Sequence, residues 1–122
     1  MATNRVDFSN TTIVIDIIGG KWDIQIISVL FSGTKRFNEL KSLVKGIQPK
    51  ILTECLQHLE EKGIINRKSY PIVPPRVEYS LTEIGKSLKP VLTHLNDWGM
   101  EYQKEYKKSS KKKLIFLDNI SC

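Results

Sequence analysis

Cysteine and long apolar runs are both scarce in this chain of 122 residues. The two cysteines, Cys55 and Cys122, lie far apart and follow no metal-ligand spacing, which fits reduced thiols rather than a disulfide framework. No stretch approaches the roughly 18 apolar residues of a membrane span. The first dozen residues carry Arg5 and Asp7 where a secretion signal needs an apolar segment. We therefore expect a cytoplasmic protein with no membrane segment.

Glycine-rich phosphate loops and catalytic constellations are also missing. His58 and His94 fall on separate predicted helices without a paired nucleophile, and "GGKW" at 19–22 lacks the spacing of a phosphate loop. Glu60 and Glu61 are adjacent at a helix end and do not converge. The sequence therefore predicts no enzyme, no metal and no cofactor.

The basic charge of the chain is unevenly spread. The formal net charge is +6. Lysine and arginine outnumber acids ten to five in residues 21–76, and a second basic stretch, "KEYKKSSKKK", covers 104–113. The length fits one domain, predicted at 9–106, and we interpret 107–122 as a solvated basic tail.

The first third of the chain predicts three helices and one short strand. Residues 11–18 have β-branched side chains typical of a strand, but they precede a clear helix and are predicted helical. Residues 21–31 form an amphipathic helix that ends near Gly33, with these residues inward: Trp22, Ile26, Ile27 and Leu30. An extended piece at 34–37 follows. A short helix then runs to Gly46, with Asn38 as cap, Glu39 in the first turn, and Leu40 and Leu43 inward.

The clearest helix is predicted at 49–62. Gln48 precedes it, Pro49 occupies the first helical position, and Gly63 ends it. Its inward stripe has Cys55 at the edge and contains Ile51, Leu52, Leu56 and Leu59. Its outward residues are Lys50, Thr53, Glu54, Gln57 and His58.

A hairpin and a long helix complete the domain. The runs 64–70 and 76–81 alternate as strands around a loop that contains Pro71, Pro74 and Pro75. Thr82 caps a final helix of about five turns, which Pro90 should kink or divide. Its apolar positions follow a spacing of three and four: Ile84, Leu88, Val91, Leu92, Leu95, Trp98 and Tyr102.

This order of elements predicts a mainly α (α+β) fold, a winged helix-turn-helix with extra N-terminal and long C-terminal helices. The helix at 49–62 would then enter the major groove of double-stranded DNA, and the hairpin would be the wing. The candidate DNA-binding residues are Lys35, Arg36, Asn38, Gln48, Pro49, Lys50, Thr53, Gln57, Arg67, Lys68 and Arg76.

Two alternatives remain open at this point. The three prolines stiffen a hairpin that docks on phosphates, or they only block edge pairing between sheets. The fold itself can also serve protein binding without specific DNA recognition, since Glu54 lies beside Lys50 on the exposed helix face.

The terminal helices carry more apolar surface than one small domain covers. The residues predicted to form a dimer interface are Ile13, Ile17, Leu88, Leu95, Trp98 and Tyr102. A two-fold homodimer would bury them and set two recognition helices about 34 Å apart.

Several blocks in order resemble the HxlR-type winged-helix transcriptional regulators: "IGGKW" at 18–22, "RFNEL" at 36–40, "GIQPKILTECLQHLEEKGII" at 46–65, "YPIVPPRVEYSLTEIGKSL" at 70–88 and "VLTHLNDWG" at 91–99. The resemblance implies a bacterial or archaeal homodimer that binds an inverted-repeat operator and pairs through its N-terminal and long C-terminal helices.

One position departs from that family. Many similar members carry a cysteine nine residues before the isoleucine of "IGGKW", which some use to sense oxidants, and this chain has Ser9 there. A hydroxyl forms no thiolate, so this redox switch is absent. Cys55 is interpreted as a small apolar filler. The inducing signal and any small-molecule effector stay undefined.

Overall fold

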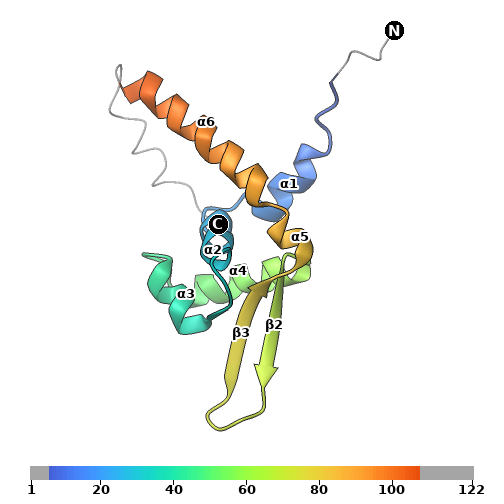
Figure 1. Cartoon of the computed structure of the whole chain (residues 1–122), viewed down its shortest axis with the longest axis vertical. Coiled ribbons are helices and arrows are strands. Elements are labelled where there is room, and N and C mark those ends of the chain that lie inside the picture. The colour runs from blue at the N-terminus through green and yellow to red at the C-terminus, as the bar shows by residue number, and fades with distance from the viewer. Residues whose placement is uncertain (1–5, 108–122) are drawn as a thin grey trace.

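The computed structural model describes residues 6–107 (Figure 1). In chain order its elements are α1 (Thr11–Ile18), α2 (Asp23–Leu30), β1 (Lys35–Arg36), α3 (Phe37–Leu43), α4 (Pro49–Glu61), β2 (Ile65–Tyr70), β3 (Arg76–Leu81), α5 (Glu83–Lys86) and α6 (Lys89–Lys107). The predicted mainly α (α+β) winged-helix fold is confirmed. The described residues end at 107, so the rest of the predicted tail at 107–122 lies outside them.

The three strands form one antiparallel sheet in the order β1-β3-β2. The register pairs Ile65 with Leu81 at the root of the hairpin and Tyr70 with Arg76 at its far end. Strand β1 adds to β3 by pairing Arg36 with Glu78. The β2–β3 ribbon projects beyond the helices (Figure 1), which leaves its distal half exposed as a wing.

The core lies between the helices and one face of the sheet. Its fully buried side chains include Ile26, Ile27, Leu40, Leu52, Leu59 and Ile65. The inward stripe predicted for α4 is therefore correct. Cys55 is a correction, because at 2% exposure it lies inside this core rather than at its edge. The turn between α1 and α2 packs over that flank of α4, which the sequence pattern of α4 alone does not reveal.

Residues 11–18 are helical as predicted, whereas α2 begins two residues later than expected. The Asp23 carboxylate accepts the Gly20 N–H at 3.0 Å, so residues 20–22 form a turn that closes onto the first residue of the helix. At the other end Gly33 has a φ of +132°, a conformation that favours glycine, and the segment turns there into β1.

The start of α3 differs from the prediction. Arg36 is the extended residue before the helix, and its N–H donates to the Glu39 carboxylate at 2.8 Å. Asn38 consequently lies inside the first turn and caps nothing. Leu43 is 53% exposed rather than inward, because the helix ends there and Val44 takes the buried position.

The final helical segment is divided. Thr82 caps α5 as predicted, accepting the Gly85 N–H at 3.0 Å, while its hydroxyl donates to the Gly63 carbonyl at 2.7 Å. Helix α5 ends at Lys86 and α6 starts at Lys89, with Pro90 in the first turn, where its missing N–H costs nothing.

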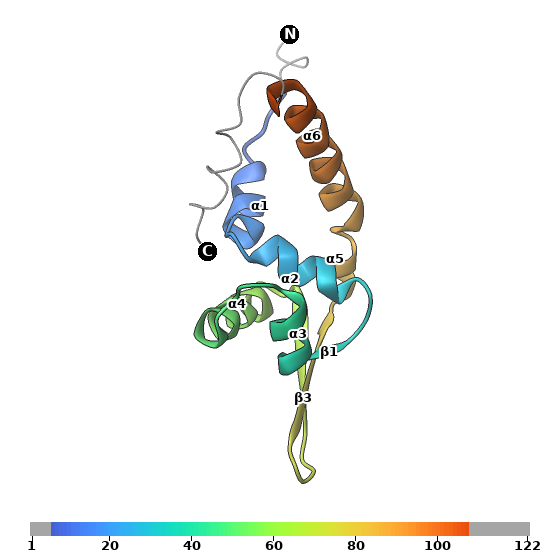
Figure 2. The same cartoon turned by 90° about the vertical axis from the view of Figure 1, so that its left-hand side faces the viewer.

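Helices α1 and α6 both rise on the side opposite the hairpin tip and diverge from each other (Figure 1). Figure 2 shows the same two helices above the layer formed by α2, α3 and α4. Among the described residues, no helix has the length and apolarity to cross a membrane.

Candidate DNA-binding surface

The N-terminal half of α4 presents a polar face. Gln48 is extended before the helix and Pro49 is its first residue, as predicted. The predicted contact residues of this segment are all exposed: Gln48, Pro49, Lys50, Thr53 and Gln57. They lie on the face away from the buried Leu52 and Leu59, so the helix separates packing from contact. His58, predicted outward, is half-buried, and its Nε2 lies 3.0 Å from the Ile17 carbonyl oxygen.

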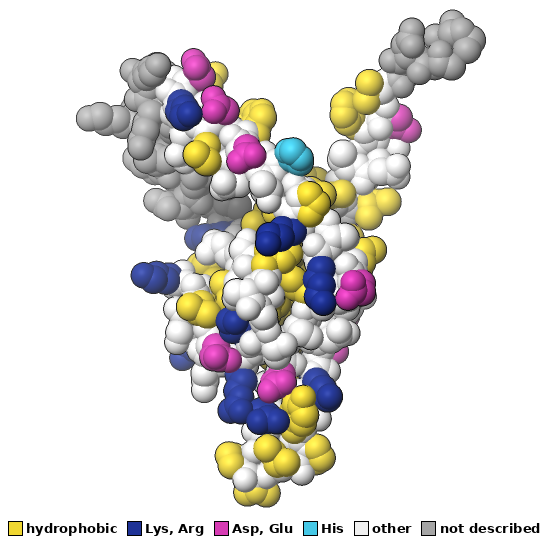
Figure 3. Space-filling model, viewed as in Figure 1, with side chains coloured by type: hydrophobic (Ala, Val, Ile, Leu, Met, Phe, Trp, Pro, Cys, Tyr) yellow, Lys and Arg dark blue, Asp and Glu magenta, His cyan; other side chains and the backbone are white. Residues whose placement is uncertain are grey.

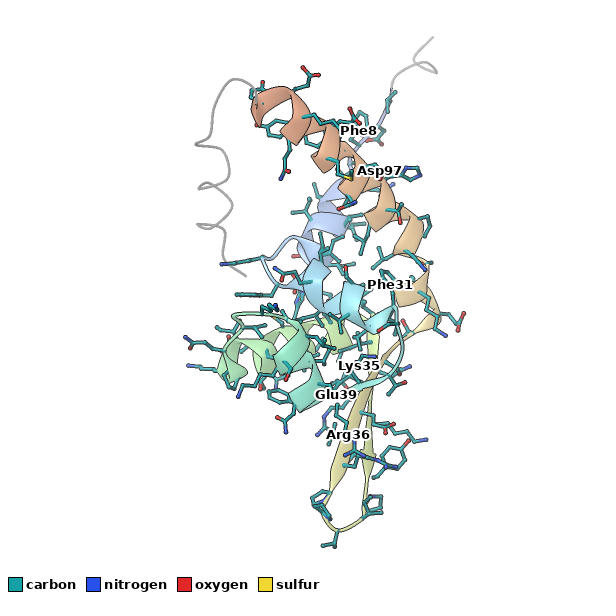
Figure 4. All side chains as sticks on the ribbon, turned by 60° about the vertical axis from the view of Figure 1, so that its left-hand side comes forward. Phe8, Phe31, Lys35, Arg36, Glu39 and Asp97 are labelled. Carbon is teal, nitrogen blue, oxygen red and sulfur yellow. The ribbon has the colours of Figure 1, made fainter. Side chains whose placement is uncertain are left out.

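The basic residues around β1 are less uniform. Arg36 and Asn38 are exposed, whereas Lys35 is half-buried with its Nζ 3.5 Å from the Gly33 carbonyl oxygen. Figure 4 labels Lys35, Arg36 and Glu39 where β1 passes into α3, beside the hairpin. Because Lys35 pairs with Tyr79 and Arg36 with Glu78, the two cations belong to opposite faces of the sheet.

The strand register also separates two cations of the wing. Lys68 pairs with Glu78 and shares its face, whereas Arg67 pairs with Tyr79 on the helix-covered face. Both arginine and lysine are exposed, but they reach different sides of the ribbon.

Arg76 lies in a small cluster around Tyr70 and Glu78. Its Nε is 3.4 Å from a Glu78 carboxylate oxygen, and its guanidinium carbon lies 4.4 Å from the centre of the Tyr70 ring. The Tyr70 hydroxyl donates to the other oxygen of Glu78 at 3.3 Å. The Lys68 ammonium lies 5.1 Å from the same ring centre. These contacts hold Arg76 in place, and its side chain remains 34% exposed.

The net charge of this wing face is positive. Arg36, Lys68 and Arg76 share it with a single acid, Glu78. Figure 3 shows the corresponding pattern, with dark blue side chains gathered around magenta at the base of the free ribbon. Such a face suits a phosphate backbone, which favours several cations at short range.

The wing tip is apolar. Residues 71–75 are all exposed, with Ile72 at 49% and Val73 at 98% exposure. In Figure 3 the tip is almost wholly yellow below the charged band. The ribbon therefore combines a cationic stem with a stiff apolar end.

Comparison with known proteins places this chain in a family. The profile of the HxlR-like helix-turn-helix family matches residues 17–107. The chain belongs to this family.

Relatives of this HxlR-like chain carry regulator names. It is 49% identical over 89 residues to YdeP of Bacillus subtilis, an uncharacterized HTH-type transcriptional regulator, covering 73% of this chain and 70% of that protein. It is 43% identical over 100 residues to an uncharacterized HTH-type transcriptional regulator of Methanothermobacter thermautotrophicus, covering 82% and 76%.

The chain also superimposes on solved structures of transcriptional and redox regulators. The chain superimposes on the HTH-type transcriptional regulator ytcD with a TM-score of 0.75 and 43% identity, covering 80% of this chain and 99% of that one. It superimposes on the reduced form of the redox regulator HypR with a TM-score of 0.75 and 39% identity, covering 84% and 100%.

The apolar residues predicted for an interface fall into two groups in this HxlR-like chain. Four are exposed within the protomer: Ile13 at 58%, Leu95 at 51%, Trp98 at 68% and Tyr102 at 40%. Ile17 and Leu88 are half-buried against the core. Along α6 the rings of Trp98, Tyr102 and Tyr106 stack with centre separations of 5.3 and 4.6 Å.

Sequence reasoning missed two members of the wing cluster. Tyr70 and Glu78 are not among the predicted site residues, although strand alternation places them on the face of Arg76. No metal site accompanies them, since the described residues contain no group of three or more His, Cys, Asp or Glu able to hold an ion.

Proposed function

We propose that this chain is a sequence-specific DNA-binding transcriptional regulator that binds an inverted-repeat operator as a homodimer. The proposal rests on the exposed polar face of the N-terminal half of α4, together with a hairpin stem that carries Arg36, Lys68 and Arg76 on the face opposite the buried Tyr79. Helix α4 packs against β2, and Figure 1 shows it at the root of the β2–β3 ribbon. Membership of the HxlR-like family supports the same reading.

The two surfaces have different tasks in this proposal. The wing face around Arg76 neutralises phosphates and fixes the register of the protein on the duplex. Gln48, Lys50, Thr53 and Gln57 on α4 meet base edges, where amide side chains pair with adenine and lysine pairs with guanine. The domain at 9–106 then acts where chromosomal DNA lies, in the cytoplasm, and performs no catalysis.

The homodimer is supported by unsatisfied apolar surface. Besides the four exposed interface residues, a groove of about 400 Å³ lies between α2 and α6, lined in part by Ile24, Leu92 and Met100. A second copy that packs its terminal helices here would bury both. Redox control through an N-terminal thiol is not proposed, because Ser9 supplies none.

Arg76→Ala tests the wing. We expect affinity for every duplex to fall alike by roughly 3- to 10-fold at low salt, with the slope of log affinity against log salt reduced by about one. Fluorescence anisotropy across a salt series measures both quantities. Lys104→Ala on α6 is the matched control, since it also removes one cation but lies on the arm opposite the wing. An unchanged affinity in Arg76→Ala would show that the wing face does not contact DNA.

Lys50→Ala and Gln48→Ala test base recognition. Operators are first selected from a random duplex library with the unchanged protein. We expect either substitution to relax preference at particular base pairs by about 1–3 kcal/mol, rather than to weaken all duplexes equally. Repeating the selection with each variant reads this out directly. If affinity fell equally for every base at every position, these residues would contact the DNA phosphates rather than the bases.

The same selection distinguishes DNA binding from the alternative function, protein binding without specific DNA recognition. A winged helix used only for protein binding would yield no enriched sequence and no steep loss of DNA affinity with added salt. Enrichment of a palindromic site would support the homodimer as well.

A further inference from the structure

A pocket of about 540 Å³ lies on the flank of α4 that adjoins its exposed polar face. One wall is the turn between α1 and α2, and the opposite wall is α4 itself. Its lining residues are Asp16, Gly20, Lys21, Trp22, Asp23, Ile51, Glu54, Cys55 and His58. None of the proposed DNA contacts belongs to this set.

The pocket contains a buried carboxylate with one unused oxygen. Asp23 is only 3% exposed, and its Oδ2 accepts the Gly20 N–H at 3.0 Å. Its Oδ1 is buried and has no hydrogen-bond partner among the described residues. Burial raises the pKa of the Asp23 carboxyl, while the Gly20 N–H and His58 act in the opposite direction. A buried acceptor without a hydrogen-bond donor destabilises the fold by about 1–3 kcal/mol, and by more when the group is charged. A group of this kind in a native structure therefore needs an explanation.

The neighbouring histidine does not meet that need. His58 Nε2 lies 3.0 Å from the Ile17 carbonyl oxygen, which can only accept, so the Nε2 hydrogen is committed there. Asp16, also in the lining, is paired with Lys62 at 3.0 Å. Both His58 and Asp16 therefore have partners elsewhere, and Asp23 Oδ1 has no hydrogen-bond donor among the described residues.

The chemistry of the lining selects a cation. Because Lys62 neutralises Asp16, the lining leaves two acids, Asp23 and Glu54, beside Lys21 and His58, in a chain whose net charge is +6. Trp22 and Ile51 add an aromatic and an aliphatic wall. The Lys21 ammonium lies 4.9 Å from the centre of the Trp22 ring, so this ring already has a cation of the chain itself beside it. The described residues hold no group suited to a metal, which favours an organic cation.

We propose that this pocket binds a small primary ammonium compound, whose cationic head donates to Asp23 Oδ1 and whose apolar body packs against Trp22 and Ile51. Its volume suits a ligand of about ten heavy atoms. Where the proposed DNA binding holds, the ligand is an effector, because α4 forms one wall of the pocket. A cation beside Glu54 offsets the repulsion between that acid and phosphate, so the ligand tightens DNA binding several-fold.

Titration calorimetry of the full chain without DNA tests the site. The probe is 2-phenylethylammonium chloride, and 2-phenylethanol is its neutral counterpart. We expect the ammonium compound to bind with a Kd on the order of 0.1–1 mM and the alcohol at least about tenfold more weakly. Equal heats for the two, or no binding of the ammonium compound, would overturn the proposal and leave a solvated carboxylate as the explanation.

Asp23→Asn tests whether the Asp23 carboxylate binds the ammonium group. An amide oxygen still accepts the Gly20 N–H, so the variant is expected to fold and to melt no lower than the unchanged protein, yet to lose at least about tenfold in ammonium affinity. Glu101→Gln, an exposed acid paired with Lys104 on α6, makes the same charge change outside the pocket and should bind normally. Equal loss in both variants would contradict a specific site.

DNA affinity is then measured with and without the ammonium probe. Tighter binding in the unchanged protein but not in Asp23→Asn supports the effector role, and weaker or unaltered binding overturns that role alone. Because the calorimetry contains no DNA, failure of the pocket and failure of the proposed DNA binding give different results.

Discussion

Leu95→Glu is expected to turn the proposed homodimer into a monomer and to lower affinity for an inverted-repeat duplex by roughly 100-fold or more. The leucine is 51% exposed within the protomer and lines the groove between α2 and α6. A carboxylate cannot be buried there without a partner, so the copies separate, and each monomer then holds only one half-site. Sedimentation equilibrium measures the mass, and anisotropy measures the affinity.

Thr93→Glu is the matched control for that experiment. It adds the same side chain two positions earlier on α6, at an exposed residue on the face opposite the apolar stripe. The control protein should remain dimeric and should bind DNA nearly as well as the unchanged protein. A Leu95→Glu protein that stays dimeric would show that the copies associate through another surface.

Gly85→Ala should destabilise the domain by about 2–4 kcal/mol. A Cβ at this buried position would lie 2.2 Å from the Ile64 carbonyl oxygen and 3.2 Å from Leu81 Cδ2. The carbonyl cannot move freely, because it accepts the Thr82 N–H at 3.0 Å. The substitution therefore forces α5 away from the root of the wing. Urea unfolding followed by far-ultraviolet circular dichroism measures the loss.

Lys86→Ala separates this steric effect from any general sensitivity of α5. Lys86 is the next residue, is exposed, and only pairs with Glu83 at 3.3 Å. Its replacement should change the free energy of unfolding by no more than about 0.5 kcal/mol. If Gly85→Ala proved as mild, the close approach of α5 to Ile64 would be wrong.

Local signals in the sequence were enough to predict most of the fold. In α4 a proline at the first position, a regular apolar stripe and a terminal glycine all agree, and the helix lies within one residue of the prediction. The predicted start of α3 at Asn38 is wrong, because Arg36 is the extended residue before the helix. Glu39 closes the first turn by accepting the Arg36 N–H, which places Asn38 inside that turn.

The site was predicted less completely, because its details depend on contacts between distant segments. Exposure of the α4 face follows from helical periodicity alone. The same periodicity places Cys55 on the inward face, but its nearly complete burial also depends on a turn some thirty residues earlier in the chain. The same turn buries Asp23, the first residue of α2, and no local pattern in the sequence predicts that burial.

The hydroxyl of Thr82 has a mechanical consequence for how two copies could fit an operator. It joins Gly63, just after α4, to Gly85 in α5, at the root of the β2–β3 ribbon. These hydrogen bonds tie the C-terminal end of α4 to the root of the β2–β3 ribbon, so that the two elements move as one rigid unit. A duplex whose half-sites are imperfectly phased must bend or twist to meet such a pair, so sequence preference would extend to flexible base steps that no side chain touches.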